Sequence, residues 1–287
     1  MRLGTRGSAL ALAQARAVAA ALDGDVEVVT ITTSGDRDRA RGDKERWVRE
    51  IDAALLRGDV DLAVHSAKDV PAQVADGIVI AAVPERADPR DALCGAESLA
   101  SLAPGARVGT SSLRRAAQLR ALRDDLEVLE LRGNVDTRLG RLAAGDYDAI
   151  VLARAGLDRL GRGAEATGVL DELVPAAGQG ALAVTVRADD ERAITAVAAV
   201  SDERAELSLL AERALVRALE ADCHTPVGAH AILAGEGGRE LLLRAFVGAP
   251  DGAMWLRDEL AGDDPEALGA EVARRLRAAG ADEVLGR

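Results

Sequence analysis

The sequence predicts an α/β protein with a separate α+β domain at its C-terminal end. Over the first 190 residues, short runs rich in Val, Ile and Leu alternate with helical patterns, which is typical of layered folds with a mostly parallel sheet. After residue 202 the pattern changes to one long helix, three β-like runs separated by Gly-rich turns, and a last helix. Turns of this length join antiparallel strands, so this part is expected to form a three-stranded antiparallel sheet with helices on one face.

The elements are expected in the following order. Buried strands are predicted in residues 25–33, 60–67, 77–83, 126–133 and 147–155, and the β-like runs of the last domain in 228–235, 239–248 and 253–260. Helices are predicted in residues 8–22, 45–58, 113–125, 202–220 and 264–280.

Composition excludes several classes of function. The net charge of -12, the pI near 4.9 and an aromatic content of 1% argue against nucleic-acid binding, which needs a positive field and often stacking side chains. No run of 18 uncharged apolar residues occurs, so we expect no membrane segment and a cytoplasmic protein. Cys94 and Cys223 form no CxxC pair and only three histidines are present, so neither a disulfide framework nor a metal site is expected.

Two turns share one pattern. Residues 2–14 and 107–119 both lead from an apolar strand through Gly-Thr and a small polar turn into a helix. Free backbone N–H groups at such a helix start favour an anion, which suggests two anion-receiving turns in two lobes. The alternative is that the hydroxyls of these turns only cap the helices.

Arginines gather at the predicted strand ends. Ligands of open α/β sheets bind outside the carboxyl ends of the strands, where these side chains would converge. Guanidinium groups match carboxylates bidentately, so a polycarboxylate is the natural ligand, whereas each arginine taken alone is explained by solvent exposure. The residues of this set are Arg6, Arg114, Arg115, Arg132, Arg138 and Arg159.

Three further residues are candidates for chemistry. Of the 36 basic residues only Lys44 and Lys68 are lysine, and Lys68 stands next to Asp69. Asp69 is a candidate acid–base group, or else an N-cap or the ion-pair partner of Lys68. Cys223 lies in a predicted loop beside His224, a setting typical of a reactive thiol.

Taken together, these stretches resemble one family, porphobilinogen deaminase or hydroxymethylbilane synthase. The resemblance covers nearly the whole chain in family order, which makes it far more specific than any single motif. The matching stretches are TRGSALALAQA, DLAVHSAKDVP, DPRDAL, VGTSSLRRAAQL, LRGNVDTRL, YDAIVLARAGLDRLG, PAAGQGALAV, ADCHTPVGA and LRAFVGAPDG.

The resemblance implies a three-domain enzyme, with two α/β lobes similar to periplasmic binding proteins followed by an α+β domain. Domain 1 would comprise residues 1–84 and 181–199, domain 2 residues 88–178, and domain 3 residues 203–287. The enzyme would join four porphobilinogens head to tail into linear hydroxymethylbilane, releasing ammonia each time. The chain would grow on a covalent dipyrromethane cofactor attached through a thioether to Cys223, and the protein would be a monomer.

The resemblance also implies roles for individual residues. Asp69 matches the catalytic aspartate, and Lys68 would pair with cofactor carboxylates. The cofactor would further be held by Ser66, Thr110, Ser111, Ser112, Arg114, Arg115, Arg132 and Arg138. The substrate would be held by Arg6, Ser8, Arg132, Arg138 and Arg159.

One stretch departs from the family pattern. Where the family often has a glycine-rich active-site segment, this chain has Lys44-Glu45-Arg46-Trp47, which reduces flexibility and adds a negative charge. This departure affects the expected lid motion and rate but not the class of reaction.

Two other functions share parts of this pattern. One is a non-enzymatic two-lobed binding protein or sensor for an acidic metabolite, which would not require Cys223 or Asp69. The other is a cysteine-nucleophile acyl transferase, for which His224 is the only local base and no oxyanion-hole motif is present.

Overall fold

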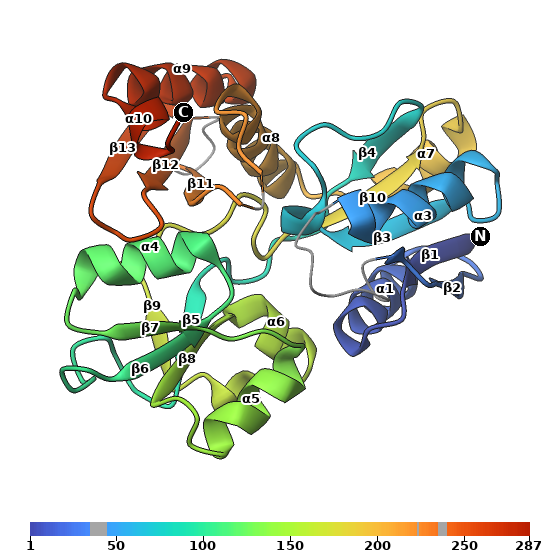
Figure 1. Cartoon of the computed structure of the whole chain (residues 1–287). Coiled ribbons are helices and arrows are strands. Elements are labelled where there is room, and N and C mark those ends of the chain that lie inside the picture. Colours follow the sequence, from blue (N-terminus) through green and yellow to red (C-terminus); the bar gives the residue numbers. More distant parts are fainter. Residues whose placement is uncertain (35–44, 223, 235–239) are drawn as a thin grey trace.

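The computed structural model describes residues 1–34, 45–222, 224–234 and 240–287, with only the backbone for residues 45–47. Its three sheets define two α/β lobes and a C-terminal domain, which we name lobe 1, lobe 2 and domain 3. Figure 1 shows lobe 1 on the right, lobe 2 at the lower left and domain 3 at the upper left.

Lobe 1 is built on a five-stranded sheet with the strand order β2-β1-β3-β10-β4. Strand β1 pairs in parallel with β2 and β3, whereas β10 is antiparallel to both of its neighbours. Four of the five strands therefore run in one direction, as predicted, but the reversed strand β10 lies inside the sheet and makes two of the four pairings antiparallel. The elements are β1 (Arg2–Arg6), α1 (Ala9–Ala21), β2 (Glu27–Ile31), α3 (Glu45–Leu56), β3 (Leu62–Ser66), the 3-10 turn η1 (Ala67–Asp69), β4 (Ile78–Ala82), β10 (Leu182–Arg187) and α7 (Glu191–Ala198).

Lobe 2 repeats this arrangement with the strand order β7-β6-β8-β5-β9. Strand β6 pairs in parallel with β7 and β8, and β5 is the reversed strand, antiparallel to β8 and β9. The elements are β5 (Asp91–Cys94), β6 (Arg107–Thr110), α4 (Leu113–Leu122), β7 (Glu127–Glu130), α5 (Val135–Ala143), β8 (Ala149–Ala153), α6 (Arg154–Arg159), the 3-10 turn η2 (Gly163–Glu165) and β9 (Gly168–Leu170).

The chain crosses between the lobes twice, and each crossing leads into a reversed strand. Residues 83–90 connect β4 to β5, and residues 171–181 connect β9 to β10; we call these the crossing segments. They lie against each other, because the backbone N–H of Ala87 donates to the carbonyl of Gly180 at 3.2 Å. Gly180 has φ +86°, and a Cβ there would stand 2.3 Å from the oxygen of Ala87, so only glycine fits this contact.

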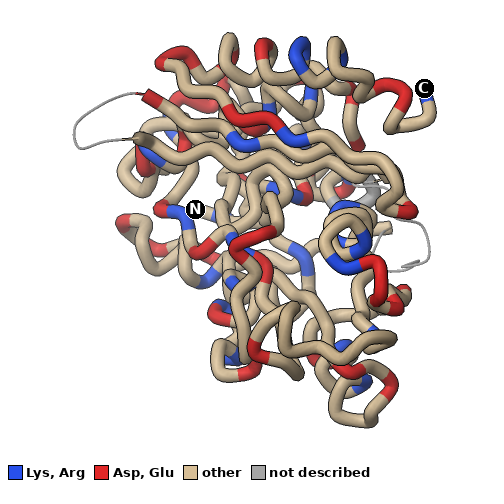
Figure 2. Tube along the Cα trace, turned by 90° about the vertical axis from the view of Figure 1, so that its left-hand side faces the viewer, with Lys and Arg blue, Asp and Glu red and all other residues tan. Residues whose placement is uncertain are grey.

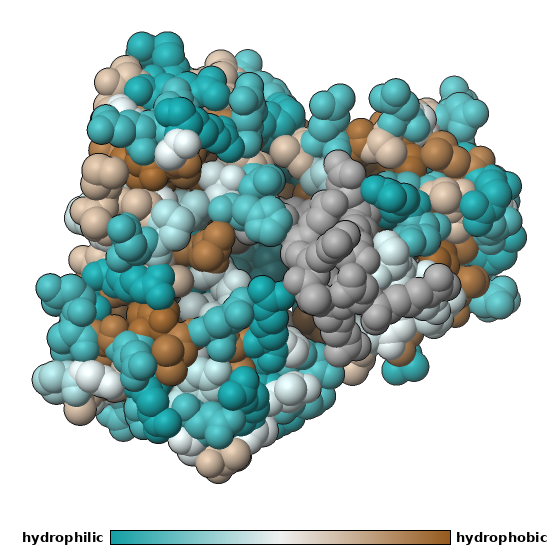
Figure 3. Space-filling model, in the orientation of Figure 1, coloured by the Kyte–Doolittle hydropathy of each residue, from teal (hydrophilic) through white to brown (hydrophobic). Residues whose placement is uncertain are grey.

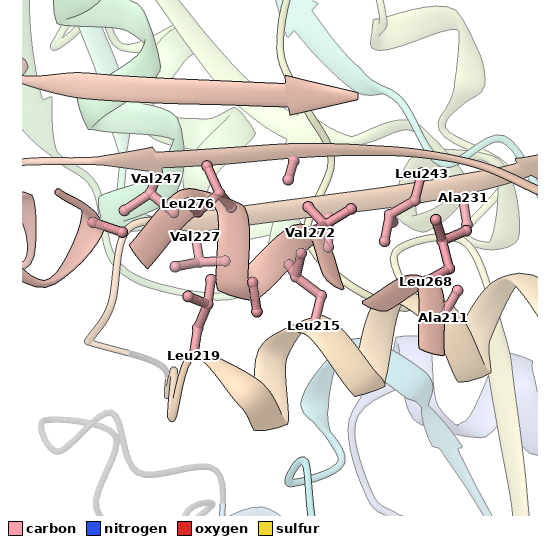
Figure 4. Packing of buried hydrophobic residues seen from close by; sticks show 14 of the residues in the cluster. Ala211, Leu215, Leu219, Val227, Ala231, Leu243, Val247, Leu268, Val272 and Leu276 are labelled. Atoms are coloured by element: carbon pink, nitrogen blue, oxygen red, sulfur yellow. The ribbon is translucent and has the colours of Figure 1, made fainter. Parts of the chain in front are cut away.

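Domain 3 packs two helices on one face of the three-stranded antiparallel sheet β11-β12-β13, as predicted. Figure 4 shows the apolar side chains between them, among which Leu215 and Val272 are fully buried. Helix α8 begins after Asp202, whose carboxylate accepts from the N–H of Ala205 at 2.8 Å. The elements are α8 (Glu203–Ala218), β11 (Val227–Leu233), β12 (Leu241–Gly248), β13 (Trp255–Gly262), α9 (Pro265–Ala278) and α10 (Ala281–Val284).

The surface carries both signs of charge. Figure 2 shows acidic and basic residues interspersed over the molecule, so a local basic site must be built against an acidic background. The side shown in Figure 3 is largely hydrophilic and is hollowed where the lobes and domain 3 meet. None of the helices in the described part of the chain is long and apolar enough to cross a membrane.

Candidate active site

The two predicted anion-receiving turns cap their helices. In lobe 1, the hydroxyl of Ser8 accepts from the N–H of Ala11 at 3.2 Å at the start of α1. In lobe 2, the hydroxyl of Ser112 accepts from the N–H of Arg115 at 3.4 Å, and Thr110 Oγ1 accepts from the N–H of Ser112 at 3.2 Å. The capping interpretation therefore holds for both turns, and anion binding there stays a prediction.

Lys68 and Asp69 form the turn at the carboxyl end of β3, where both side chains are half-buried. The ammonium of Lys68 donates to Gln179 Oε1 at 3.2 Å and makes no ion pair with Asp69 within the described residues. Burial, followed by the charge of Arg115, lowers the pKa of Lys68 to about 8. Asp69 is neither an N-cap nor a salt-bridge partner of Lys68 in this structure, so neither of the two structural roles considered for this carboxylate applies.

Neutral polar side chains lie at the end of β3, next to Lys68 and Asp69 in the sequence. Ser66, the last residue of β3, accepts from Gln14 Nε2 at 2.8 Å. The buried His65 lies within 3.2 Å of the hydroxyl of Thr185. Burial, followed by the positive charge of Arg6, lowers the pKa of His65 to about 4, so its ring is neutral near pH 7.

Arg114 and Arg115 are buried in the first turn of α4 and share one carboxylate. Arg114 Nη2 donates to Asp91 Oδ2 at 2.8 Å, and Arg115 donates to Asp91 Oδ1 through Nε at 2.9 Å and Nη2 at 2.7 Å. Although burial opposes ionisation of Asp91, the two guanidinium groups hold its pKa well below the usual range. Two cations thus face one buried anion, which leaves an excess of positive charge.

The remaining arginines occupy different positions around this pair. Arg138 donates to the hydroxyl of Ser111 at 2.9 Å and to the carbonyl of Gly133 at 2.8 Å, and burial, followed by the charge of Arg115, lowers its pKa to about 10. Arg159 donates to the carbonyl of Gly180 on a crossing segment at 2.7 Å. Arg132 is exposed and paired with the carboxylate of Glu130 at 2.7 Å.

The structure therefore brings most of the predicted basic residues to the junction of the lobes. Besides burial, the positive charge of Arg115 lowers the pKa of Lys68, Arg114 and Arg138, whereas Arg132 is exposed and forms an ion pair with Glu130. Arg6 is half-buried at the end of β1, and its positive charge contributes, after burial, to the lowered pKa of His65.

Cys223 and Lys44 lie outside the described residues. The neighbours of Cys223 form a local turn, in which the N–H of His224 and the hydroxyl of Thr225 both donate to Asp222 Oδ1, at 2.9 Å and 2.6 Å. Glu45 is the first residue of α3.

Sequence reasoning did not single out Asp91 and Gln179. Both stand in stretches that carry the family resemblance, DPRDAL and PAAGQG, but their sequence context gives no sign that they would contact Lys68 or the arginines. Asp91 directly follows the first crossing segment and Gln179 lies on the second, so both crossing segments reach the site.

Comparison with known proteins gives the same family for both parts of the chain. Residues 1–195 match the model of the porphobilinogen deaminase dipyromethane cofactor binding domain, and residues 207–278 match the model of the porphobilinogen deaminase C-terminal domain. A porphobilinogen deaminase from Rubrobacter xylanophilus is 52% identical over 85% of this chain and 80% of its own length. One from Roseiflexus sp. is 51% identical over 83% and 79%, respectively. Among solved structures, the methionine-binding protein MetQ matches 72% of this chain and 91% of its own at 15% identity and a TM-score of 0.44.

Proposed function

Because the chain belongs to the porphobilinogen deaminase family, we propose that the basic cluster at its lobe junction holds the carboxylates of a growing pyrrole chain. The family are transferases that make hydroxymethylbilane from porphobilinogen on a dipyrromethane cofactor in tetrapyrrole biosynthesis. The observation that carries the assignment of the site is the pair Arg114–Arg115, buried against the single carboxylate of Asp91.

The residues present fit such a cofactor. Dipyrromethane carries several carboxylates, and the cluster has more cations than anions. In addition, Arg114 is only 5% exposed, and its buried Nε donor has no hydrogen-bond partner in the described part of the chain. A buried donor of this kind is costly unless something accepts from it. We assign cofactor binding to Lys68, Ser66, Thr110, Ser111, Ser112, Arg114, Arg115, Arg132 and Arg138, with covalent attachment at Cys223. When bound, the cofactor supplies the pyrrole carbon to which the first substrate is joined.

Substrate binding and acid–base work fall to other residues of the cluster. Arg6, Ser8 and Arg159, together with Arg132 and Arg138, would orient the acetate and propionate of porphobilinogen. Asp69 would stabilise the positive charge that develops on the pyrrole as the C–N bond breaks and ammonia leaves. After the new C–C bond forms, the same carboxylate would accept the proton released from the α-carbon of the pyrrole ring that acted as the nucleophile. A half-buried carboxylate free of a salt bridge with Lys68 is suited to this cycle.

The intact mass of the purified protein tests this assignment. We expect an excess over the chain mass equal to two porphobilinogens less two ammonias, located on the Cys223 peptide and absent from Cys223→Ser. In Asp69→Ala the excess should persist while turnover is lost. A bare chain that gains no adduct on incubation with porphobilinogen would favour a binding protein for acidic metabolites.

We further propose that the protein acts as a cytoplasmic monomer. The buried free thiol of Cys94 is in keeping with a reducing compartment. Sedimentation at working concentration would reveal a dimer if this expectation is wrong.

A further inference from the structure

Two buried residues, Asp91 and Gln179, join the cations of the two lobes to each other. Asp91 is fully buried at the start of β5, and Gln179 is 1% exposed on the second crossing segment. The amide nitrogen of Gln179 donates to Asp91 Oδ1 at 2.7 Å. Its amide oxygen accepts from Lys68 Nζ at 3.2 Å and from Arg115 Nη2 at 3.5 Å. One side chain thus connects the lysine of lobe 1 with the arginine–aspartate cluster of lobe 2.

The chemistry of this contact requires an amide. An ammonium can only donate and an ionised carboxylate can only accept, so the orientation of the Gln179 amide is fixed by its two neighbours. A glutamate at this position would face Asp91 with a like charge and would offset the charge of Lys68. An apolar residue would remove the acceptor from a half-buried ammonium. Glutamine directs Lys68 without adding negative charge to the cluster.

The backbone of Gln179 is fixed from domain 3. Its carbonyl accepts from Arg86 Nε at 2.9 Å, and Arg86 also donates to both carboxylate oxygens of Glu212 on α8, at 2.6 Å and 3.1 Å. The N–H of the preceding Gly178 donates to Glu212 Oε2 at 2.6 Å. The Gln179 side chain donates in addition to the carbonyl of Pro89 at 2.7 Å. The amide therefore has little freedom to turn away from Lys68.

We propose that Gln179 and Asp91 are positioning residues, which hold Lys68, Arg114 and Arg115 together as one preformed receptor for carboxylates of the pyrrole chain. The proposal rests on the function proposed for this cluster. A receptor that is ordered before binding loses less conformational freedom on binding, and so binds more tightly. A purely structural role explains the arrangement less well, because apolar residues of similar volume are often as stabilising as a buried ionic cluster.

The two lysines of the chain allow a direct test by NMR. In protein labelled with ¹³C at lysine Cε only Lys44 and Lys68 give signals, and Lys44→Arg assigns them. The groups that act on Lys68 are Arg115, Arg114, Asp69 and Asp91. In the purified protein, with its cofactor content recorded by mass, we expect Gln179→Met and Asp91→Asn each to lower the pKa of Lys68 by about one unit, through loss of an acceptor or of a negative charge. An unchanged pKa in Gln179→Met would overturn the proposal.

Gln118→Met is the matched control. Gln118 is equally buried, but among the described residues its amide forms hydrogen bonds only with backbone groups, namely the N–H of Val174 at 2.7 Å and the carbonyls of Val174 and Arg114 at 3.0 Å and 3.5 Å. This variant should lose stability and keep the pKa of Lys68. An equal fall of that pKa in Gln118→Met would mean general loosening of the cluster and would also overturn the proposal.

Kinetics supply the second readout. For Gln179→Met we expect the KM for porphobilinogen to rise about tenfold, as for one lost charge-assisted hydrogen bond, with a smaller change in kcat. A fall in kcat alone would contradict a positioning role. The NMR titration needs no porphobilinogen, so it stands even if the mass experiment finds no pyrrole. Conversely, the protein could be active and carry the pyrrole adduct while Gln179→Met leaves the pKa of Lys68 unchanged. That result would overturn only the positioning role and not the function proposed for the cluster.

Discussion

Truncation of Glu212 should destabilise the protein more than any surface change on the same helix. The carboxylate is fully buried and is bound by both nitrogens of the Arg86 fork. It also accepts from the N–H groups of Gly178 and Ala231, at 2.6 Å and 2.8 Å, and lies 3.3 Å from His230 Nδ1. Glu212→Ala would leave one guanidinium and two backbone donors without these partners.

Two independent arguments give the size of the effect. Removal of one partner from a buried ion pair typically costs about 3–5 kcal/mol. In addition, despite the opposing effect of burial, the charges and hydrogen bonds of Arg86 and His230 lower the pKa of Glu212 from 4.5 to about 2. At about 1.4 kcal/mol per pKa unit, this shift corresponds to roughly 3 kcal/mol. Because the folded-state pKa is the lower one, this contribution is present above about pH 4.5 and is lost as the pH falls toward 2.

Urea unfolding followed by circular dichroism at pH 7 measures the loss, with Glu266→Ala as the control. Glu266, in the first turn of α9, is the 53% exposed partner of Arg217 on α8, and its truncation should cost under about 1 kcal/mol. The Glu212 variant should also show a weaker decline in stability between pH 4.5 and pH 2 than the wild type. Equal losses in the two variants at pH 7 would refute the reasoning, because burial would then not distinguish them.

Three other perturbations test separate features. Burial raises the pKa of Asp52 to about 6, so the folded state resists ionisation of this carboxyl and the protein loses stability as the pH rises from about 4 through 6. Asp52→Asn should therefore stabilise the protein at pH 8 by about 1–2 kcal/mol, after allowance for partial exposure of the side chain. Urea unfolding should show a smaller gain at pH 4.5. Gly180→Ala should lower the Tm by several degrees in calorimetry, since its Cβ would meet the oxygen of Ala87 at a positive φ, and an unchanged Tm would show that the crossing segments yield easily. Burial, as the main cause, raises the pKa of Cys94 to about 11, so a maleimide should label this thiol only after unfolding; rapid labelling of the folded protein, mapped by peptide mass, would contradict its burial.

The sequence predicted local elements better than their pairing. The strand expected in residues 126–133 is observed as Glu127–Glu130, and the helix expected in 202–220 as Glu203–Ala218, because periodicity reports burial while caps and turns set the ends. Periodicity carries no information on which strand lies beside which. The reversed strands β5 and β10 could therefore not be foreseen, since their neighbours are determined by chain crossings between the lobes.

The same limit applies to the site. The position of Arg114 and Arg115 after a strand correctly suggested that they lie at a sheet edge, but not that both are buried against Asp91. That contact joins α4 to the reversed strand β5, so it depends on a pairing that no local pattern encodes. Family resemblance supplied roles for the arginines, whereas their supporting acid emerged only from the geometry.

The position of the site at the crossings has a mechanical consequence. Lys68 belongs to lobe 1, Asp91 to lobe 2, and Gln179 lies on the segment between them while its backbone is fixed through Arg86. Rotation of one lobe against the other therefore acts first on the 3.2 Å contact between Lys68 and Gln179, which is longer than the 2.7 Å contact that joins Gln179 to Asp91. A lobe movement that admits another pyrrole ring would leave the arginine–aspartate cluster intact and would change the surroundings of Lys68. Accordingly, addition of porphobilinogen should change the NMR signal of Lys68, while the arginine–aspartate cluster stays intact.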